Sequence, residues 1–404
     1  MKTNSKRILI FSLAYEPYIG GAELAIKEIT TRISGNYIFD MVTLRYDSSL
    51  PKFEKIGNVN VYRIGLSKKS PSYSDMLHFP MYMLKVLYPL LAFLKAFRLQ
   101  FKYHYDAVWS IMTYMGFPAL FFKLFFWKTK IILTLQDGDT TAHLVGRKRI
   151  RIVYPLLKLA FYFVDFVQPI STHLQKYAEQ LGYRGKLLIV PNGVSDVFFD
   201  IIPPEKIKEE RSILKYSDED IIIITTSRLV TKNAVGDIIS ALSFLPLRYK
   251  LLVVGDGPLM PSLEDQVSNL GLEERVTFLG EANHRDIPKY LQMANIFVRP
   301  SLSEGLGSSF LEAMASGLPI VGTPVGGIID FLKDIDEYNE FANGAYAQIS
   351  DPQSIANAVF QITEDEALYQ SIRKNGKTMI YEDYRWEGIS ERIEKEIFDV
   401  VINK

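Results

Sequence analysis

The sequence predicts an α/β protein of two domains, each with a parallel β-sheet covered by helices. Three observations indicate this class. The chain has 404 residues, too many for one ordinary core and suitable for two domains. Along both halves, short apolar runs alternate with helical stretches. Many of the runs are almost wholly aliphatic or β-branched, as expected for strands that are buried on both faces.

Six runs of the first half are expected to be strands. The first follows a basic start, and Glu16 and Pro17 end it too early for the apolar region of a signal peptide. In chain order the runs are RILIFSLA at 7–14, FDMVTLR at 39–45, VNVYRIG at 59–65, AVWSIM at 107–112, KIILTLQ at 130–136 and DFVQPIS at 165–171.

Five runs of the second half are expected to be strands, and the two domains are expected to meet near residues 190–210, where proline and charge accumulate. The last segment, 385–404, is amphipathic and is expected to be a helix that packs back against another part of the chain. The five runs are IIIITTS at 221–227, KLLVVGDG at 250–257, RVTFLG at 275–280, NIFVRPS at 295–301 and PIVGTPVGG at 319–327.

The charge is distributed unevenly although the net charge is zero. Residues 1–200 contain 26 Lys and Arg against 14 Asp and Glu, whereas residues 201–404 contain 20 against 32. The two halves therefore either face different partners or have solvated surfaces that differ in sign. The absence of cysteine excludes disulfides, thiolate metal ligands and a cysteine nucleophile, and it suits a reducing compartment. No uncharged run reaches the roughly 18 residues of a membrane span.

The stretch RPSLSEGLGSSFLEAMASGLPIVGTPVGG at 299–327 combines two carboxylates with a glycine-rich turn. We expect Ser308 to cap a helix over about 309–316 that ends at Gly317. The free amides of its first turn would bind an anion such as phosphate. Glu304 and Glu312 would repel a phosphate, so they should face hydroxyls, and the stretch suits a sugar nucleotide. Either glutamate taken alone could instead be a solvated charge.

Cations for a diphosphate are expected directly after the first strand of the second half. Arg228 offers a two-pronged donor and Lys232, four residues later, a mobile point charge. Ligands of open parallel sheets bind beyond the carboxyl ends of the strands. Polar or glycine-rich loops stand at those ends, at Ser227-Arg228, Gly255–Pro258, Gly280-Glu281 and Ser301–Gly307.

Several of these motifs, in this order, resemble the retaining glycosyltransferases of family 4. The residues that carry the resemblance are EPYIGGAELA near the amino terminus, VPNGV at 190–194, TSRLVTKNAVGDII, VVGDGPL, VTFLG and EGLGSSFLEAMASGLPIV. The resemblance implies the GT-B fold, with two facing Rossmann-like domains and a cleft between them. It implies a first domain over 1–195, a donor-binding domain over 196–380 and a C-terminal helix over 381–404 that returns to the first domain.

The resemblance also implies roles for individual residues. Glu312 would bind the ribose hydroxyls, and Glu304 would contact the transferred sugar. Arg228 and Lys232 would neutralise the diphosphate, and with Glu304 they are the catalytic candidates. The other donor-binding candidates are Gly305, Leu306, Gly307, Ser308 and Ser309 at the sugar and phosphate, Thr277 and Phe278 at the base, Gly255 in the loop after its strand, and Gly20 and Gly21 at the diphosphate.

The chain departs from the family pattern at two places. Asn233-Ala234 stands where Lys-Gly is common, so Lys232 lies one position early. Gln136, Asp137 and Asp139 stand where many members have a histidine, and they are the candidates for the acceptor side. Asp-x-Asp at 137–139 could bind Mn or Mg beside a diphosphate, but the family resembled generally works without metal. We therefore expect no metal and no cofactor, because the nucleoside-diphosphate sugar is a substrate.

Three segments of the first half place Lys and Arg among large apolar residues, at 76–102, 117–130 and 146–163. Such segments suit helices that lie in the headgroup layer of an anionic membrane, or core helices with ordinary surface lysines. We expect a peripheral protein on the cytoplasmic face of the membrane that acts on an unknown hydroxyl acceptor, for which a lipid-linked one is an option. No nucleic-acid partner is expected, because no recognition motif accompanies the basic residues.

Other functions remain open at this point. A dinucleotide oxidoreductase is disfavoured because Met260 occupies the place of the third glycine after GDGPL. A sugar-nucleotide epimerase or a phosphorylase would share the fold and the phosphate site. A non-catalytic binder of sugar nucleotides would share the site but not the turnover.

Overall fold

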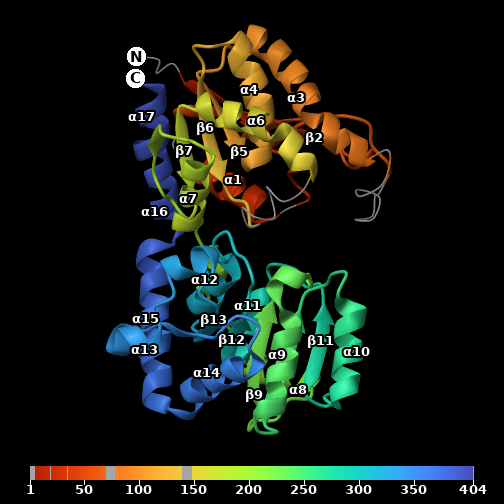
Figure 1. Cartoon of the computed structure of the whole chain (residues 1–404), viewed down its shortest axis with the longest axis vertical. Coiled ribbons are helices and arrows are strands. Elements are labelled where there is room, and N and C mark those ends of the chain that lie inside the picture. The colour runs from red at the N-terminus through yellow and green to blue at the C-terminus, as the bar shows by residue number, and fades with distance from the viewer. Residues whose placement is uncertain are drawn as a thin grey trace. The chain divides into compact units, whose positions relative to one another are not determined.

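The computed structural model of the chain describes residues 5–403 apart from 19, 34, 70–78, 80 and 139–147, and for 148–152 it describes the backbone only. The chain forms two compact units, each drawn with its helices and strands in Figure 1. Unit 1 comprises Met1–Asn192 and Trp386–Lys404, and unit 2 comprises Gly193–Arg385. Unit 1 therefore ends three residues before the boundary expected at 195, and unit 2 ends five residues after the boundary expected at 380.

The described part of unit 1 contains an eight-stranded sheet in the order β3-β4-β2-β1-β5-β6-β7-β8. All neighbours are parallel except β3 and β4. The strands are β1 (Lys6–Phe11), β2 (Tyr37–Leu44), β3 (Phe53–Ile56), β4 (Val59–Ile64), β5 (Ala107–Ile111), β6 (Lys130–Leu135), β7 (Phe166–Pro169) and β8 (Lys186–Leu187).

The six predicted strands of this half are all present, and the two edge strands β3 and β8 were not predicted. β3 and β4 form an antiparallel hairpin joined at Gly57, whose φ of +54° lies in the left-handed region that glycine adopts without strain. The residues of β3 alternate between partly buried and exposed, so they lack the continuous apolar run that marks the inner strands.

Helices cover both faces of this sheet. On one face, α1 (Gly21–Arg32) packs beside the C-terminal helix, and Ile26, Trp386 and Phe398 belong to one core cluster with Ile8 and Phe39 of the strands. This confirms the prediction that the C-terminal helix returns to the first domain. The C-terminal helix consists of α16 (Trp386–Arg392), a π-helical turn (Ile393–Phe398) and α17 (Asp399–Ile402).

The other face of the same sheet is covered by α3 (Met81–Tyr103) and α4 (Gly116–Phe125), which pack against each other. The buried Tyr88 hydroxyl of α3 donates to the carbonyls of Ser12 and Val42, at 2.9 and 2.7 Å, and so fastens α3 to the strand ends. The other helices in the described part of unit 1 are α6 (Lys148–Tyr162), α7 (Thr172–Gln180) and the short 3₁₀ turn η1 (Thr113–Met115).

The sheet of unit 2 is wholly parallel and has the order β11-β10-β9-β12-β13-β14 in the described residues. Strands β9, β10 and β11 follow one another outward, and β12 then returns to the other side of β9. The order therefore reverses between β9 and β12, which is where open parallel sheets bind ligands. The strands are β9 (Ile221–Thr226), β10 (Tyr249–Val254), β11 (Val276–Gly280), β12 (Ile296–Arg299), β13 (Ile320–Gly322) and β14 (Gly344–Tyr346).

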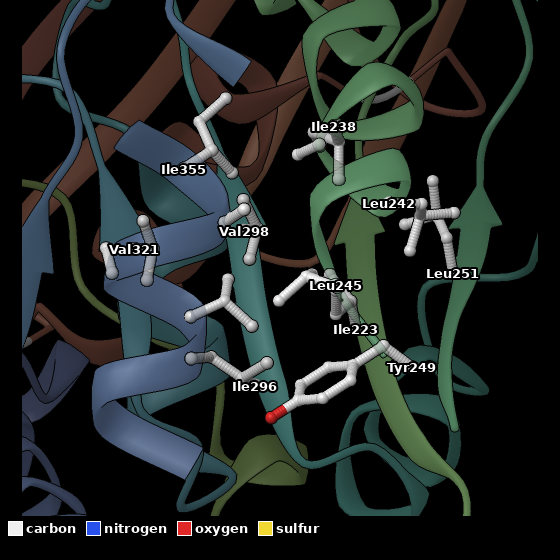
Figure 2. Close-up of a cluster of buried hydrophobic side chains, with 14 of the residues drawn as sticks. Ile223, Ile238, Leu242, Leu245, Tyr249, Leu251, Ile296, Val298, Val321 and Ile355 are labelled. Atoms are coloured by element: carbon white, nitrogen blue, oxygen red, sulfur yellow. The ribbon is translucent and has the colours of Figure 1, made fainter. Parts of the chain in front are cut away.

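An apolar cluster between this sheet and its helices fixes the strands in place. Figure 2 shows Ile223, Ile296 and Val298 of the central strands against Ile238 of α9 and Ile355 of α14. The helices of unit 2 are α8 (Pro204–Ile213), α9 (Val235–Ala241), α10 (Met260–Leu270), α11 (Ile287–Met293), α12 (Ser308–Ala315), α13 (Ile335–Tyr338), α14 (Pro352–Glu364) and α15 (Glu366–Asp383), and its 3₁₀ turns are η2 (Asp196–Phe198), η3 (Thr231–Asn233), η4 (Leu242–Phe244), η5 (Gly326–Asp330) and η6 (Asn339–Phe341).

Candidate functional site

The loops after β9, β10 and β11 are joined by backbone hydrogen bonds at the carboxyl ends of the strands. The Gly255 amide donates to the Gly280 carbonyl at 2.8 Å, and the Leu229 amide donates to the Asp256 carbonyl at 2.9 Å. The three loops therefore form one continuous edge, and the backbone of Leu229 ties the loop after β9 to it.

Two glycines make this close packing possible. A Cβ atom on Gly255 would lie 1.9 Å from the Ser227 carbonyl oxygen, and one on Gly257 would lie 2.4 Å from the Leu229 carbonyl oxygen. No side chain fits at such distances, and φ of Gly255 is +140° as well. The GDG motif thus has a structural role that sequence reasoning did not assign: it positions the loop that carries Arg228.

Arg228 is exposed at this edge, and no ion pair holds its guanidinium within the described part of the chain. Lys232 lies in the 3₁₀ turn η3 and is partly buried. The Lys232 carbonyl accepts a hydrogen bond from the Leu302 amide at 2.7 Å, which joins the loop after β9 to the loop after β12. The structure therefore joins the loop that carries both cationic candidates to the loop after β12, residues 300–307, which contains Glu304 and is called the glutamate loop below.

The backbone of the glutamate loop is held from the other side by the segment after β13. The Gly327 amide donates to the Glu304 carbonyl at 3.3 Å, and a Cβ atom on Gly326 would lie 1.9 Å from the same oxygen. Residues Gly305 and Gly307 and the side chain of Leu306 are buried. Leu306 can therefore reach a ligand only through its backbone.

The predicted capping role of Ser308 is wrong. Helix α12 begins at Ser308 itself, and its N-cap is Gly307 in the left-handed region with φ of +92°. A serine cap requires extended backbone at its own position, whereas the turn here needs a residue without Cβ one position earlier. The predicted end of the helix is confirmed, because Gly317 has φ of +84° and the amides of Gly317 and Leu318 bond back to the last turn.

Sequence reasoning missed Arg299, the last residue of β12. Its guanidinium donates to a carboxylate oxygen of Glu304 and to the Ser309 hydroxyl, the latter at 2.6 Å. The Ser301 hydroxyl donates to the same carboxylate oxygen at 3.0 Å. Glu304 is consequently a buried, paired carboxylate rather than an open one. The run NIFVRPS already contained the signal, since a charge at the end of an apolar central strand must be buried with a partner.

Glu312 lies one turn into α12 and is partly buried, with 17% of its side chain exposed. The imidazole Nε2 of His284 is 3.4 Å from its Oε1, and the His284 ring meets the Phe198 ring edge-on at 5.2 Å between centroids. Glu312 and Glu304 thus stand on the same helix–loop unit in different surroundings, one accessible and one enclosed.

Thr277 and Phe278 lie inside strand β11 and not at its end, which is Gly280. Both are partly buried, and they pair in register with Leu252 and Val253 of β10. Since β11 is an edge strand in the described sheet, one side of its backbone remains available for recognition of a base.

The glycine pair predicted to approach a diphosphate lies in unit 1. Gly20 is the N-cap of α1 and Gly21 its first residue. The Gly20 amide donates to the Glu23 carboxylate at 2.9 Å, and burial raises the pKa of Glu23. A Cβ atom on Gly21 would meet no atom within 4 Å, so the space before this helix start is open within unit 1.

The acceptor-side candidates already have partners inside unit 1. The side-chain amides of Gln136 and Asn192 bond to each other reciprocally, at 3.0 and 3.2 Å. One carboxylate oxygen of Asp137 accepts from the Thr113 amide at 3.0 Å and from its hydroxyl at 2.7 Å. Asp139 lies outside the described residues. Among the residues that are described, no cluster of three or more His, Asp or Glu could hold a metal ion.

Comparison with known proteins decides the family. Residues 206–379 match the family model "Glycosyl transferases group 1". The chain is 31% identical over 277 residues to N-acetyl-alpha-D-glucosaminyl L-malate synthase of Bacillus anthracis. The matched region covers 68% of this chain and 69% of that protein. The chain belongs to the group 1 glycosyltransferases.

Two further comparisons extend this assignment. A UDP-Gal:alpha-D-GlcNAc-diphosphoundecaprenol alpha-1,3-galactosyltransferase of Escherichia coli is 29% identical over 227 residues, 54% of this chain and 56% of that one. The crystal structure of HepE from Anabaena in complex with UDP-glucose superimposes with a TM-score of 0.77 at 20% identity, over 97% of this chain and 99% of that one. The glycosyltransferase therefore has the GT-B fold, as predicted.

In this glycosyltransferase the unusual pair Asn233-Ala234 has a clear structural effect. Asn233 is buried, and its side-chain amide donates to the Arg228 carbonyl at 2.7 Å, so it shapes the loop that carries the arginine. Ala234 has φ of +49° and ψ of +39°, a left-handed conformation in which a glycine would be unstrained. The chain thus keeps the backbone turn that suits glycine although it lacks the glycine.

Proposed function

We propose that this group 1 glycosyltransferase moves a sugar from a nucleoside diphosphate to an acceptor hydroxyl with retention of the anomeric configuration. The observation that carries the proposal is the edge of unit 2 at which the sheet order reverses. There Arg228, Lys232 and the first turn of α12 supply positive charge, and Glu304 and Glu312 supply carboxylate acceptors for hydroxyls.

The proposed reaction breaks the bond between the anomeric carbon and the diphosphate oxygen. The acceptor oxygen bonds to the same carbon from the same face, and the acceptor proton passes to the departing diphosphate oxygen. Fixed positive groups that stabilise the leaving diphosphate would supply most of the rate acceleration. No resident metal or cofactor takes part in this scheme, because Arg228, Lys232 and the amides of α12 provide the charge.

The pairing of Glu304 supports same-face attack over a covalent glycosyl intermediate. A carboxylate that accepts hydrogen bonds from Arg299 and Ser301 has reduced negative charge for attack on carbon. We therefore assign Glu304 to the binding of sugar hydroxyls, and we assign Glu312 to the ribose.

A labelled donor distinguishes this function from an epimerase, a phosphorylase and a binder. The protein is incubated with UDP or GDP sugars that carry a radiolabelled sugar, together with a membrane extract as a source of acceptors. A transferase labels an acceptor, an epimerase returns a different sugar nucleotide, and a phosphorylase consumes inorganic phosphate. Transfer that persists unchanged in Glu304→Ala and Arg228→Ala would contradict the proposed site.

We propose further that the protein is peripheral on the cytoplasmic face of an anionic membrane and that its acceptor is lipid-linked. Helix α3 carries an exposed apolar stripe, with exposed fractions of 45% for Leu87, 50% for Leu90 and 49% for Leu94. The helix contains no acidic residue, and Lys85 and Arg98 lie exposed beside the stripe. Apolar side chains flanked by basic ones suit the headgroup layer of anionic lipids.

The end of α4 extends this surface. Rings of α3 and α4 interlock, and Phe101, Phe125 and Trp127 remain 64%, 62% and 72% exposed. Lys128 lies over the Trp127 ring at 5.4 Å. A second copy of the chain is a poorer occupant of this surface than lipid, because the basic residues of the two copies would face each other. The basic residues 147–151 expected to join this surface have no described side chains.

None of the described helices combines the length and apolarity needed to cross a bilayer. Flotation with vesicles of phosphatidylcholine and phosphatidylglycerol tests peripheral attachment. The protein should float with vesicles containing phosphatidylglycerol at low salt and less at high salt, because screening weakens the basic contacts. Absence from the floating fraction at low salt would contradict the attachment.

A further inference from the structure

The guanidinium of Arg299 is buried at the point where the sheet order of unit 2 reverses. Only 9% of its side chain and 9% of the Glu304 side chain are exposed. A buried charge is costly unless it is both paired and fully hydrogen-bonded, so its partners determine what such a group can do.

Four groups surround this guanidinium, and they come from three different segments. Its Nη2 donates to Glu304 Oε1, and its Nε donates to the Ser301 hydroxyl at 3.2 Å, both in the loop after β12. Its Nη1 donates to the Ser309 hydroxyl in the first turn of α12 at 2.6 Å. The same Nη1 lies 3.5 Å from the Thr226 carbonyl oxygen at the end of β9.

The guanidinium is also fixed by packing. It lies over the Phe310 ring with its carbon 5.1 Å from the ring centroid, and Phe310 is fully buried against Phe297 and Phe331. The planar guanidinium of Arg299 thus packs with one face on an aromatic ring, and its N–H groups donate to acceptors in its plane. These contacts together fix its orientation.

The partner carboxylate has one oxygen engaged and one available. Glu304 Oε1 accepts from both Arg299 and Ser301. Its Oε2 receives no hydrogen bond from the residues that the structure describes, so it can accept one from a ligand hydroxyl. The arginine keeps the acceptor turned in one direction before any ligand arrives.

We propose that Arg299 is a positioning residue of the donor site, which holds the Glu304 carboxylate and the first turn of α12 in the arrangement that receives the transferred sugar. This inference rests on the proposed transfer function. Arg299 itself does not touch the donor. Its removal should therefore weaken recognition of the sugar more than recognition of the nucleoside diphosphate, because the diphosphate is assigned to Arg228, Lys232 and the backbone amides of α12, and the ribose to Glu312.

Calorimetric binding of matched ligand pairs tests this inference. The probes are UDP against UDP-glucose and GDP against GDP-mannose, measured well below the unfolding temperature. For the pair that the wild-type protein binds, we compare the Kd of the sugar nucleotide with the Kd of the nucleoside diphosphate. In Arg299→Leu the ratio of these two Kd values should rise about tenfold, as loss of a charged hydrogen-bond contact implies. The transfer rate should fall about 100-fold, and Arg299→Lys, which keeps the charge but not the fork, should recover part of the ratio.

Two controls separate positioning from simple loss of stability. Arg275 is also buried in unit 2, and among the described residues its guanidinium donates only to backbone carbonyls away from this edge, at Leu242, Leu245, Pro246 and Tyr249. Arg275→Leu should lower stability and leave the Kd ratio unchanged. The double variant Arg299→Leu with Glu304→Gln removes the unpaired carboxylate, so its stability should recover while the ratio stays shifted.

The outcomes are distinguishable. If Arg299→Leu keeps the wild-type ratio and rate, or if the double variant regains both, Arg299 has no positioning role although the transfer function stands. If the wild-type protein binds none of the four probes, the proposed function fails and the inference fails with it.

Discussion

Each unit pairs an arginine with a buried carboxylate, but the two pairs lie at opposite ends of their strands. In unit 1, Arg7 near the start of β1 donates to both oxygens of Asp40, which is fully buried, at 2.7 and 3.1 Å. In unit 2, Arg299 at the end of β12 donates to Glu304. Both pairs consist of a guanidinium and a carboxylate, but the pair of unit 1 lies toward the amino ends of the strands and the pair of unit 2 lies at the carboxyl ends.

The position of each pair indicates its role. Ligands of parallel sheets bind beyond the carboxyl ends of the strands, so a pair at the amino ends can serve only the fold. The remaining partners of Asp40 agree with this. The hydroxyl of Tyr105 donates to it at 2.7 Å and the amide of Asn60 at 2.8 Å, so the carboxylate is enclosed by protein donors. Glu304 has an oxygen that no described residue engages.

The first way to test this comparison is to break the pair in unit 1, where we expect the largest effect. Asp40→Asn leaves Arg7 without a charged partner, and the free energy of unfolding should fall by about 3–5 kcal/mol. Burial, which the variant keeps, is the main cause that raises the pKa of Tyr105 far above its ordinary value, so the tyrosine cannot ionise to compensate. Urea unfolding measures the loss, and a change below about 1 kcal/mol would show that the pair is not structural.

The second test removes a cation at the edge of unit 2. Arg228→Ala should lower the transfer rate by about 10²–10³-fold, because a fixed positive group no longer faces the leaving diphosphate. Stability should hardly change, since Arg228 is exposed. Lys208→Ala, an exposed lysine of α8 in the same unit, is the matched control and should keep the wild-type rate. Equal rates for the two variants would remove Arg228 from the site.

The third test concerns the exposed surfaces of the two units. Leu87→Glu with Leu90→Glu on α3 should reduce flotation with anionic vesicles by tenfold or more, because burial of one leucine contributes about 1.5–3 kcal/mol. Binding of UDP or GDP should be unaffected. Leu270→Glu on α10 of unit 2, where the leucine is 44% exposed, should leave flotation unchanged. Equal flotation of the α3 variant and the wild type would disconnect α3 from the membrane.

The smallest effect is expected from backbone strain at two residues that follow strands, one in each unit. Ala234 after β9 and Met112 after β5 both have positive φ, +49° and +73°. Ala234→Gly and Met112→Gly should each raise the free energy of unfolding by about 1 kcal/mol, because glycine adopts these conformations without a Cβ clash. Urea titration measures the gain. A loss of stability in either variant would mean that side-chain contacts outweigh the strain there.

The central strands and the family motifs could be predicted from the sequence, because continuous aliphatic runs and ordered motifs are local signals. Edge elements could not. β3 and β8 are short and half exposed, and β14 consists of three small or aromatic residues, so their pairing depends on neighbours that are distant in sequence.

The residues proposed for the site come from the sequence, whereas the contacts that hold them come from the folded backbone. The positions of Arg228, Glu304 and Glu312 follow from the strand order, whereas the cap of α12 depends on φ of Gly307, which the sequence alone does not reveal. The pairing of Arg299 with Glu304 became visible only when β12 placed the arginine beneath the loop. The sequence placed Gly255 among the donor-binding candidates, whereas the close contacts of Gly255 and Gly257 with the loop after β9 required the folded backbone.

A crystal structure of the protein soaked with a UDP or GDP sugar tests the central claim most directly. We predict that the diphosphate lies between Arg228 and the amides of Ser308 and Ser309, with a sugar hydroxyl within hydrogen-bond distance of Glu304 Oε2. A nucleotide bound elsewhere, with this edge of unit 2 unoccupied, would contradict the account.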